Sequence, residues 1–389
     1  MIGWKPLDFV PMGTPVLLVL TALRWVGAAR MPRALAQAGF DVTLLTPPGS
    51  LAEKSGFVAK IAYLPEKATP DAWVHGFAAT AKATAARLVV PCDDNAFTLL
   101  QRLATSPPEG LQPALHQELA TLVADSLGDP AHYADSVDPT LLPAAAAALG
   151  LRVPAHAIVS DVAGAQSFGA AHGYPILLKS RRSRDGVTVG THSELAGAIA
   201  ALSPDPAAGQ GESRNALLVQ AQIRGQLRSY QSVAWKGELL AGFAGERIHD
   251  EAGRGRQTGV NRYFRSDALR AIAARLAQGF GISGLFSLEG VVAENGDFRL
   301  LDINRRLLGG AHRGSEFGVD HCAALHAAMH GLPYAGRTDL DEGEEHICVS
   351  FPQEWLRDPE SKWLRDYPVD VPWDEPELFE AMLDLYPTR

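Results

Sequence analysis

One segment of the chain predicts a β-hairpin whose strands carry charged residues on a shared face. In FSLEGVVAENGDFRLLDINRRLLGG, beginning at Phe286, two apolar runs flank Asn295-Gly296. Asn-Gly between apolar runs is a strong signal for a two-residue type I′ turn between antiparallel strands. With those two residues as the loop, Glu289 lies directly opposite Asp302.

Alternation along the second strand decides which side chains join this pair of acids. Successive residues of a strand point to opposite faces of the sheet. Asp302, Asn304 and Arg306 therefore share the face of the opposing glutamate. The apolar residues between them, Leu301 and Ile303, are expected to point to the other face.

Two carboxylates directly opposite each other on neighbouring strands repel, so the fold must compensate for them. A cation between the acids is one solution, and full solvation of both acids is the other. Carboxylate and amide oxygens are ligands that suit a hard cation such as Mg²⁺. The pattern therefore predicts either a metal site or the solvated outer face of a hairpin.

The composition is that of an ordinary globular protein. The chain has 389 residues, enough for two or three domains, with 47% hydrophobic and 20% charged residues. A formal net charge of -9 gives no electrostatic footprint for nucleic acid. The three cysteines show neither paired nor metal-binding spacing. This cysteine pattern fits a reducing cytosol, so we expect a cytoplasmic protein. No apolar run is long enough for a membrane span.

The first part of the chain alternates strand and helix patterns. Apolar runs predict strands at 15–20, 40–47 and 87–94, and the stretches between them predict helices at 29–39 and 71–86. This order predicts a parallel, doubly wound α/β sheet, which binds ligands at the carboxyl ends of its strands. Thr21–Ala28 and Cys92–Asn95 are therefore candidate ligand loops. Asp93 and Asp94 have two open interpretations, a helix N-cap or a substrate contact.

The following section has an α+β pattern that is rich in antiparallel strands. Helices are expected at 114–127, 137–149 and 266–281, strands at 154–160, 174–180 and 216–223, and a hairpin at 228–248 that turns near Lys236-Gly237. This pattern predicts subdomains with largely antiparallel sheets.

Lys179 ends the apolar strand YPILLK and precedes an arginine-rich loop, SRRSRDGVTVG. A lysine that leaves a strand into a flexible loop is able to contact a polyphosphate as a point charge. The loop adds Arg181, Arg182 and Arg184. The alternative interpretation is a surface turn whose arginines are solvated.

The order of these elements resembles that of the ATP-grasp superfamily. A strand ending in lysine is followed by a loop, the strand LLVQAQIRG and the hairpin EGVV…LLDINRR. The superfamily includes D-alanine–D-alanine ligase, biotin carboxylase and the carbamoyl phosphate synthetase large subunit. The resemblance covers about residues 15–335, and the hairpin motif is its most specific part. It implies an ATP molecule held between two α+β subdomains, with Mg²⁺, or Mn²⁺ as the alternative, bridging the phosphates.

The resemblance implies roles for the charged residues, position by position. Glu289 and Asp302 match the acidic metal ligands, and Asn304 matches the amide ligand. Arg306 matches the catalytic arginine that contacts the transferred phosphoryl group or the acyl phosphate. Lys179 matches the lysine on the α- and β-phosphates.

Further implied roles concern the nucleotide and the closure of the site. The backbone of four consecutive residues is expected to read adenine: Gln220, Ala221, Gln222 and Ile223. Arg181 is expected to contact phosphate. The loop 246–265 is expected to close over triphosphate and substrate, with Arg256 binding an anion in the catalytic site. The alternative for this loop is a surface segment with its arginines in water.

Two positions depart from the superfamily pattern. The place of a second phosphate-binding lysine, after Asp138, holds Pro139, and the place of the usual ribose-binding acid holds Leu227. We hypothesise that an arginine of the loop after Lys179 supplies the missing charge.

These observations predict four regions. They are a pre-ATP-grasp α/β domain at 1–125, linker helices and a small subdomain at 126–220, a large subdomain with the metal site at 221–338, and a C-terminal extension at 339–389.

The implied function is an ATP- and Mg²⁺-dependent ligase that joins a small-molecule carboxylate to an amine through an acyl phosphate and releases ADP and phosphate. An amino acid or small peptide is the expected substrate, and a homodimer is compatible with the resemblance. A small-molecule kinase and a non-catalytic nucleotide-binding protein are the alternatives.

Overall fold

The computed structural model describes residues 13–65, 68–106, 110–181, 186–202, 216–249, 259–307 and 309–385. The chain forms two compact units. The first comprises Met1–Leu127, Arg306–Thr338 and Pro372–Arg389, and the second comprises Gly128–Arg305 and Asp339–Val371. Each unit is described by itself below.

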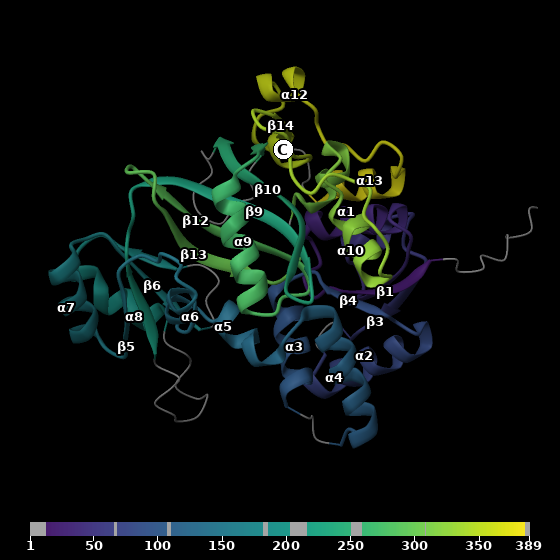
Figure 1. Ribbon diagram of the computed structural model, residues 1–389, viewed down its shortest axis with the longest axis horizontal. Coiled ribbons are helices and arrows are strands. Elements are labelled where there is room, and N and C mark those ends of the chain that lie inside the picture. The colour runs from purple at the N-terminus through teal and green to yellow at the C-terminus, as the bar shows by residue number, and fades with distance from the viewer. Residues whose placement is uncertain are drawn as a thin grey trace, which may run out of the picture. The chain divides into compact units, whose positions relative to one another are not determined.

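A four-stranded parallel sheet lies at the centre of the first unit, in the order β3-β2-β1-β4 (Figure 1). Its strands are β1 (Thr14–Val19), β2 (Phe40–Thr46), β3 (Lys60–Tyr63) and β4 (Leu88–Pro91). The helices between and after them are α1 (Val26–Gln37), η1 (Leu51–Lys54), α2 (Pro70–Thr84), α3 (Asp94–Thr105) and α4 (Pro113–Leu127). The predicted parallel α/β domain is confirmed. Strand β3 was not predicted; it has only four residues, and three of them are exposed.

Two later segments of the chain complete the first unit. Residues 306–338, which we expected in the large subdomain, contribute η6 (Ala311–Phe317) and α10 (His321–Met329). The end of the expected extension contributes α13 (Pro376–Asp384), which packs against η1. The regions expected at 221–338 and 339–389 are therefore each shared between the two units.

Side-chain contacts explain why α10 belongs to the first unit. The ring of His326 lies edge-on to Phe40, with the ring centroids 5.0 Å apart. Thr14 Oγ1 hydrogen-bonds the Nε2 atoms of His326 and His330 at 3.1 and 2.7 Å. These contacts fix the helix against the start of β1 and β2.

The second unit contains a small antiparallel sheet in the order β5-β8-β6-β7. Its strands are β5 (His156–Val159), β6 (Ile176–Ser180), β7 (Val187–Val189) and β8 (Leu217–Ala221). Helices α7 (Val162–His172) and α8 (Leu195–Leu202) contribute to its apolar core. Asp161 caps α7 through its side chain, as expected for a helix that begins after Ser160-Asp161.

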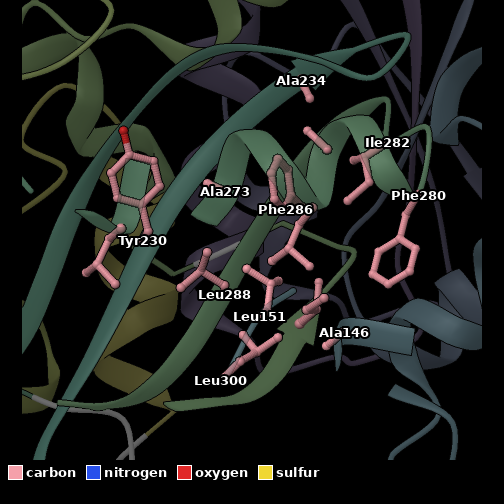
Figure 2. Close-up of a cluster of buried hydrophobic side chains, with 14 of the residues drawn as sticks. Ala146, Leu151, Tyr230, Ala234, Ala273, Phe280, Ile282, Phe286, Leu288 and Leu300 are labelled. Carbon is pink, nitrogen blue, oxygen red and sulfur yellow. The ribbon is translucent and has the colours of Figure 1, made fainter. Parts of the chain in front are cut away.

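A large antiparallel sheet completes the second unit, in the order β13-β12-β9-β10-β11-β14. Its strands are β9 (Gly225–Trp235), β10 (Glu238–His249), β11 (Val260–Phe264), β12 (Gly284–Ala293), β13 (Phe298–Asn304) and β14 (Glu345–Val349). Helix α9 (Asp267–Gly279) packs against β9 and β10 (Figure 1). Figure 2 shows residues of the core between helix and sheet, among them Tyr230, Ala273, Phe286 and Leu288.

Shorter helices fill the remainder of the second unit. They are η2 (Pro130–His132), α5 (Tyr133–Val137), α6 (Leu142–Ala148), η3 (His192–Glu194), α11 (Gln353–Arg357) and α12 (Lys362–Asp366). The helix predicted at 137–149 is confirmed only from Leu142 onward, as α6, and the part of the prediction before Leu142 is wrong. Asp138 ends α5, and its carboxylate accepts hydrogen bonds from the N–H and hydroxyl of Thr140, while Pro139 disfavours a continuous helix.

Strands β11 and β14 of the large sheet lie where the sequence did not predict strands. In the segment expected as a closing loop, 246–265, the end of β10 pairs with β11. Residues 250–258 of this segment lie outside the described part of the chain. Strand β14 of the C-terminal extension pairs with β11 and forms the outer strand of the sheet.

The predicted hairpin turn at Lys236-Gly237 is confirmed. Both residues have positive φ, +51° and +82°, which a type I′ turn requires. Elsewhere, none of the helices in the described ranges combines the length and apolar character that crossing a bilayer demands.

Candidate active site

The acid-bearing hairpin is formed by β12 and β13. Glu289 lies opposite Asp302, and Ser287 lies opposite Asn304, in the antiparallel register. The predicted opposition of the two acids is therefore confirmed. Asp302 has 38% of its side chain accessible, and Glu289 is half-buried, so both carboxylates are within reach of a ligand.

The turn of this hairpin differs from the predicted two-residue loop. Val292 faces Phe298, and Gly296 N–H donates to the carbonyl of Ala293 at 2.8 Å. Ala293 N–H donates to the carbonyl of Asp297 at 2.9 Å, and Gly296 has φ +83°. These contacts are typical of a three-residue loop that ends in a left-handed glycine. The predicted turn is thus wrong by one residue.

A β-bulge in β13 restores the register before the acids are reached. The pair nearer the turn is Gly290 with Leu300, so Leu301 is the extra residue of the bulge. The buried residues of this strand are consequently Leu300 and Ile303, whereas we had predicted Leu301 and Ile303. The shift at the turn and the shift at the bulge cancel, which is why an incorrect turn still placed the acids opposite each other.

Lys179 reaches the hairpin from β6 of the small sheet. Its Nζ lies 4.0 Å from Asp302 Oδ2, and 10% of its side chain is accessible. This separation is an ion pair at its outer limit and is too long for a hydrogen bond. The ammonium therefore offsets part of the negative charge of the acid pair, and it is positioned to donate to an anionic ligand such as a phosphate oxygen.

The oxygen donors of the hairpin fit a hard divalent cation. Asp302 Oδ1 accepts a hydrogen bond from Ile303 N–H at 2.9 Å, and Asn304 Nδ2 lies 3.4 Å from Ser287 Oγ, contacts that orient both side chains. The carboxylate of Glu289 has no hydrogen bond or ion pair within the described residues. No three of the described His, Cys, Asp and Glu side chains gather as a metal site. The protein would thus supply two carboxylates and one amide, leaving other positions of a Mg²⁺ ion to phosphate and water.

The predicted adenine-reading segment lies where the small sheet leads into the large sheet. Gln220 and Ala221 still belong to β8, which pairs with β5 and β6 on its two sides. Gln222 and Ile223 lie beyond the strand, in the link to β9. Their backbone groups are therefore the better placed of the four for a ligand, and the contact with adenine stays a prediction.

Arg181 lies beside the position where the sequence departs from the superfamily pattern. Its Nε donates to Asp138 Oδ2 at 2.5 Å, and Asp138 directly precedes Pro139. An arginine from the loop after β6 thus reaches the place where a lysine was expected. Arg182, Arg184 and Arg256 lie outside the described residues.

Arg306 belongs to the first unit, and its contacts are described there. Its Nε donates to Asp94 Oδ1 at 2.7 Å, and its guanidinium lies over the ring of Trp25, 5.2 Å from the centroid. Asp94 opens α3 at the carboxyl end of β4. Arg306 is therefore held at the sheet edge where ligands of such folds bind, and its catalytic role stays a prediction.

The fold was compared with known proteins. No protein-family model matches the sequence, and no curated protein matches it. Many solved structures share the fold, among them the following three. The biotin carboxylase domain of Hydrogenobacter thermophilus 2-oxoglutarate carboxylase, with MgADP and bicarbonate, has a TM-score of 0.63 and 16% identity, over 86% of this chain and 74% of that chain.

Two further enzymes match over a similar extent. N5-carboxyaminoimidazole synthase from Aspergillus clavatus, with ADP and 5-aminoimidazole ribonucleotide, has a TM-score of 0.61 and 16% identity, over 86% of this chain and 81% of that chain. L-amino acid ligase from Bacillus licheniformis has a TM-score of 0.56 and 14% identity, over 82% of this chain and 74% of that chain. The chain has an ATP-grasp fold.

Within this ATP-grasp fold, Arg305 is a buried residue that sequence reasoning missed. It is 2% exposed, its Nη1 donates to Ser136 Oγ at 3.0 Å, and its guanidinium lies 5.9 Å from the ring centroid of Tyr133. Burial lowers the pKa of Arg305 to about 10, which leaves the side chain protonated at neutral pH. It ties the end of the acid-bearing strand to α5. Arg305 and Arg306 are adjacent in the hairpin motif, and the sequence did not distinguish them. Only the burial of Arg305 shows that its role differs from that of Arg306.

Asp93 is the second residue whose role the structure resolves. Its carboxylate accepts hydrogen bonds from the backbone N–H groups of Thr21, Ala22 and Ala96 and from the Thr21 hydroxyl, at 2.6–3.0 Å. Asp93 is 2% exposed. Of the two interpretations left open by the sequence, the helix N-cap is correct for this residue, and it also fixes the loop after β1.

Proposed function

We propose that the protein is an ADP-forming ligase that joins a small-molecule carboxylate to an amine, using ATP and Mg²⁺. The observation that carries this proposal is the opposition of Glu289 and Asp302 on neighbouring strands, with the Lys179 ammonium 4.0 Å from one of them. An acid pair with an adjacent cation suits a metal-bound polyphosphate better than it suits a purely structural hairpin, because opposed carboxylates destabilise an unliganded sheet. The ATP-grasp fold supports the same conclusion.

The side chains divide the work of phosphoryl transfer between them. Glu289, Asp302 and Asn304 would hold Mg²⁺, which when bound neutralises charge on the nucleotide phosphates. Lys179 donates to a phosphate oxygen as a point charge. Arg306 stabilises charge as the phosphoryl group passes from ATP to the substrate carboxylate. Such positioning and electrostatic contacts are the main protein contribution to this class of reaction.

Amide bond formation then needs no protein nucleophile. The acyl phosphate formed on the substrate carboxylate is attacked by the amine, and phosphate leaves. What the chain must supply is a site that excludes water, because water would hydrolyse the acyl phosphate. We propose that the segment between β10 and β11 closes the site, with Arg256 binding an anion.

The structural neighbours support the choice of a small-molecule substrate. Their names record bicarbonate, an aminoimidazole ribonucleotide and L-amino acids as ligands or substrates of those proteins. We propose an amino acid or small peptide for this chain. A homodimer, as in the biotin carboxylase domain dimer, stays a prediction, as does the use of Mn²⁺.

Arg181 is proposed to replace the absent phosphate-binding lysine. Its contact with Asp138 places the guanidinium next to Pro139, although the two segments are far apart in sequence. Arg181→Gln should raise the KM for ATP about tenfold, the cost of one charge-assisted hydrogen bond, with the free energy of unfolding nearly unchanged, since 39% of the side chain is accessible. Arg299→Gln, at an arginine of β13, is the matched control. An unchanged KM for ATP in the Arg181 variant would remove this part of the proposal.

Two alternatives keep the same nucleotide site. A small-molecule kinase would transfer the phosphoryl group to a hydroxyl, and its ADP release would need no amine. A non-catalytic nucleotide-binding protein is motivated by Pro139 and Leu227, which stand in place of a lysine and an acid. The complete set of metal-binding oxygens argues for turnover, because a binder gains little from it.

A coupled ADP-release assay with pooled amino acids tests the proposal. The expected result is ADP release that requires Mg²⁺ and two substrates, one supplying a carboxylate and the other an amine, with equal amounts of phosphate and amide product. Phosphorylated product without amide would favour the kinase. Nucleotide binding without ADP release across a broad pool would favour the non-catalytic protein.

A further inference from the structure

A cavity of about 390 Å³ lies in the first unit, and none of the residues assigned to metal, ATP or phosphoryl transfer lines it. It opens at the carboxyl ends of the parallel strands, between the segments that follow β1, β2 and β3 and the first turns of α2 and α3. Its wall is formed by Thr21, Pro47, Leu64, Pro65, Ala68, Pro70, Trp73, Asn95, Thr98, Leu99 and Arg102. A volume of this size lies within the range of small-molecule sites, and this edge of a parallel sheet is where ligands bind.

Three side chains of the cavity wall have a polar group without a partner among the described residues, whereas the hydroxyls of Thr21 and Thr98 donate to Asp93 and to the Asp94 carbonyl. Neither the Arg102 guanidinium nor the Asn95 amide has a hydrogen bond or ion pair within the described residues. Trp73 is 3% exposed, and its indole Nε1 is buried without a hydrogen-bond partner. Among the described residues of the wall, Arg102 is the one charged side chain and no carboxylate is present. The cavity is therefore electrostatically suited to a ligand with a single negative charge.

Most of the remaining wall residues are apolar. Leu64 and Trp73 are each 3% exposed, and Trp73 stacks on Phe77, with interplanar angle 5° and ring centroids 5.3 Å apart. Three prolines restrict the backbone around the cavity, because the proline ring fixes φ. A preformed apolar pocket loses little conformational entropy when a ligand enters. The tail of the ligand is thus expected to be apolar.

We propose that this cavity binds a small monocarboxylate with an apolar tail. The carboxylate pairs with the Arg102 guanidinium, whose planar fork matches two carboxylate oxygens. The tail packs between Leu64, Trp73 and the prolines. This binding site lies wholly in the first unit and does not depend on the metal-binding hairpin.

Ligand-observed ¹⁹F NMR on the full chain tests the proposal, with 3-(4-fluorophenyl)propionate as the probe and no nucleotide or Mg²⁺ present. We expect saturable binding, at least tenfold weaker binding of the neutral amide of the same acid, and at least a tenfold loss of affinity in Arg102→Gln, the loss of a charge-assisted pair. Arg87→Gln, at another exposed arginine of the first unit, should bind the probe normally. Inorganic phosphate at equal concentration should not displace it.

A second variant distinguishes loss of the binding site from loss of the folded structure. Thr98→Trp places a bulky ring at the cavity wall from an exposed position, and it should abolish probe binding while the melting temperature stays within a few degrees of the wild type. Glu289→Gln should bind the probe as the wild type does, which separates this test from that of the proposed ligase. Absence of binding, equal binding of acid and amide, displacement by phosphate, or unchanged affinity in Arg102→Gln would each overturn the proposal.

Discussion

Two pairs of acids in this molecule were candidates for ligand binding from the sequence and differ in what surrounds them. Asp93 and Asp94 follow β4 of the parallel sheet, and Glu289 and Asp302 lie in the antiparallel hairpin. The carboxylate of Asp93 accepts four hydrogen bonds and is 2% exposed. The carboxylate of Glu289 accepts none within the described residues and is half-buried beside a second acid.

This difference indicates which acid holds the fold together and which one is available to a ligand. A buried carboxylate with several backbone donors is stabilised in its charged form by the protein itself. Two opposed carboxylates repel each other, the Lys179 ammonium at 4.0 Å from one of them offsets only part of that charge, and a bound cation is the simplest further compensation. The comparison therefore assigns Asp93 to structure and the hairpin acids to binding.

The largest expected effect is in the hairpin. Glu289→Gln should lower kcat/KM for ATP in the ADP-release assay about 30- to 1,000-fold, since loss of one charged group at such a site costs about 2–4 kcal/mol in the transition state. Its free energy of unfolding should be unchanged or slightly higher, because the repulsion with Asp302 is relieved. Glu294→Gln, an exposed acid in the turn of the same hairpin, is the control. Equal kcat/KM values in both variants would remove the distinction between the two acid pairs.

The opposite result is expected at Asp93. Asp93→Ala should lower the free energy of unfolding by about 3 kcal/mol, because it removes a helix cap and leaves backbone donors unsatisfied in a buried position. Urea unfolding measures this loss. Asp71→Ala, at an exposed acid in the first turn of α2, should cost far less. If Asp93→Ala were as stable as the wild type, the number of hydrogen-bond donors around a carboxylate would not identify the acids that stabilise this fold.

A third test sharpens the account of the hairpin register. A Cβ added at Gly290 would lie 2.3 Å from the backbone oxygen of Arg299 and 2.3 Å from the ring of Phe298. Gly290→Ala should therefore destabilise the protein by about 1–3 kcal/mol and weaken Mg²⁺-dependent ATP binding, because the adjacent bulge sets the acid pair. Gly197→Ala, in α8 with nothing near its added Cβ, should be neutral or stabilising. Normal stability in Gly290→Ala would contradict the bulge geometry.

The smallest effect concerns an acid between the two extremes, Asp339. It accepts hydrogen bonds from Tyr230 and Leu340 and lies 3.7 Å from Arg270, yet burial raises its pKa above the usual 3.8. The folded state therefore holds this proton more tightly than the unfolded state does. The associated stability is present below pH 3.8 and is lost as the pH rises through the raised pKa.

Asp339→Asn removes this titration. The stability difference between wild type and Asp339→Asn should change in favour of the variant as the pH rises from about 3.5 to 6.5. Unfolding midpoints measured across that range provide the test. A stability difference that is constant with pH, or that changes in favour of the wild type as the pH rises, would contradict this expectation. It would show that the protein stabilises the Asp339 carboxylate as well as it stabilises that of Asp93.

The sequence by itself determined the features that depend on local pattern. Apolar alternation and turn residues were enough for the parallel α/β domain and the Lys236-Gly237 turn, because a strand has a period of two and because few residues accept positive φ. The opposition of Glu289 and Asp302 was also predicted correctly, but only because the shift at the turn and the shift at the bulge cancel. The candidate metal residues and Lys179 came from the same signals together with the resemblance to ATP-grasp enzymes.

Only the tertiary structure decided features whose partners are distant along the chain. Strands β11 and β14 carry weak local signals and exist because each completes the hydrogen bonding of a neighbour. The four donors to Asp93 include residues more than seventy positions earlier in the sequence, and Arg181 reaches Asp138 across 43 positions. Hydrogen-bond satisfaction and burial are properties of the assembled fold, so sequence pattern alone does not specify them.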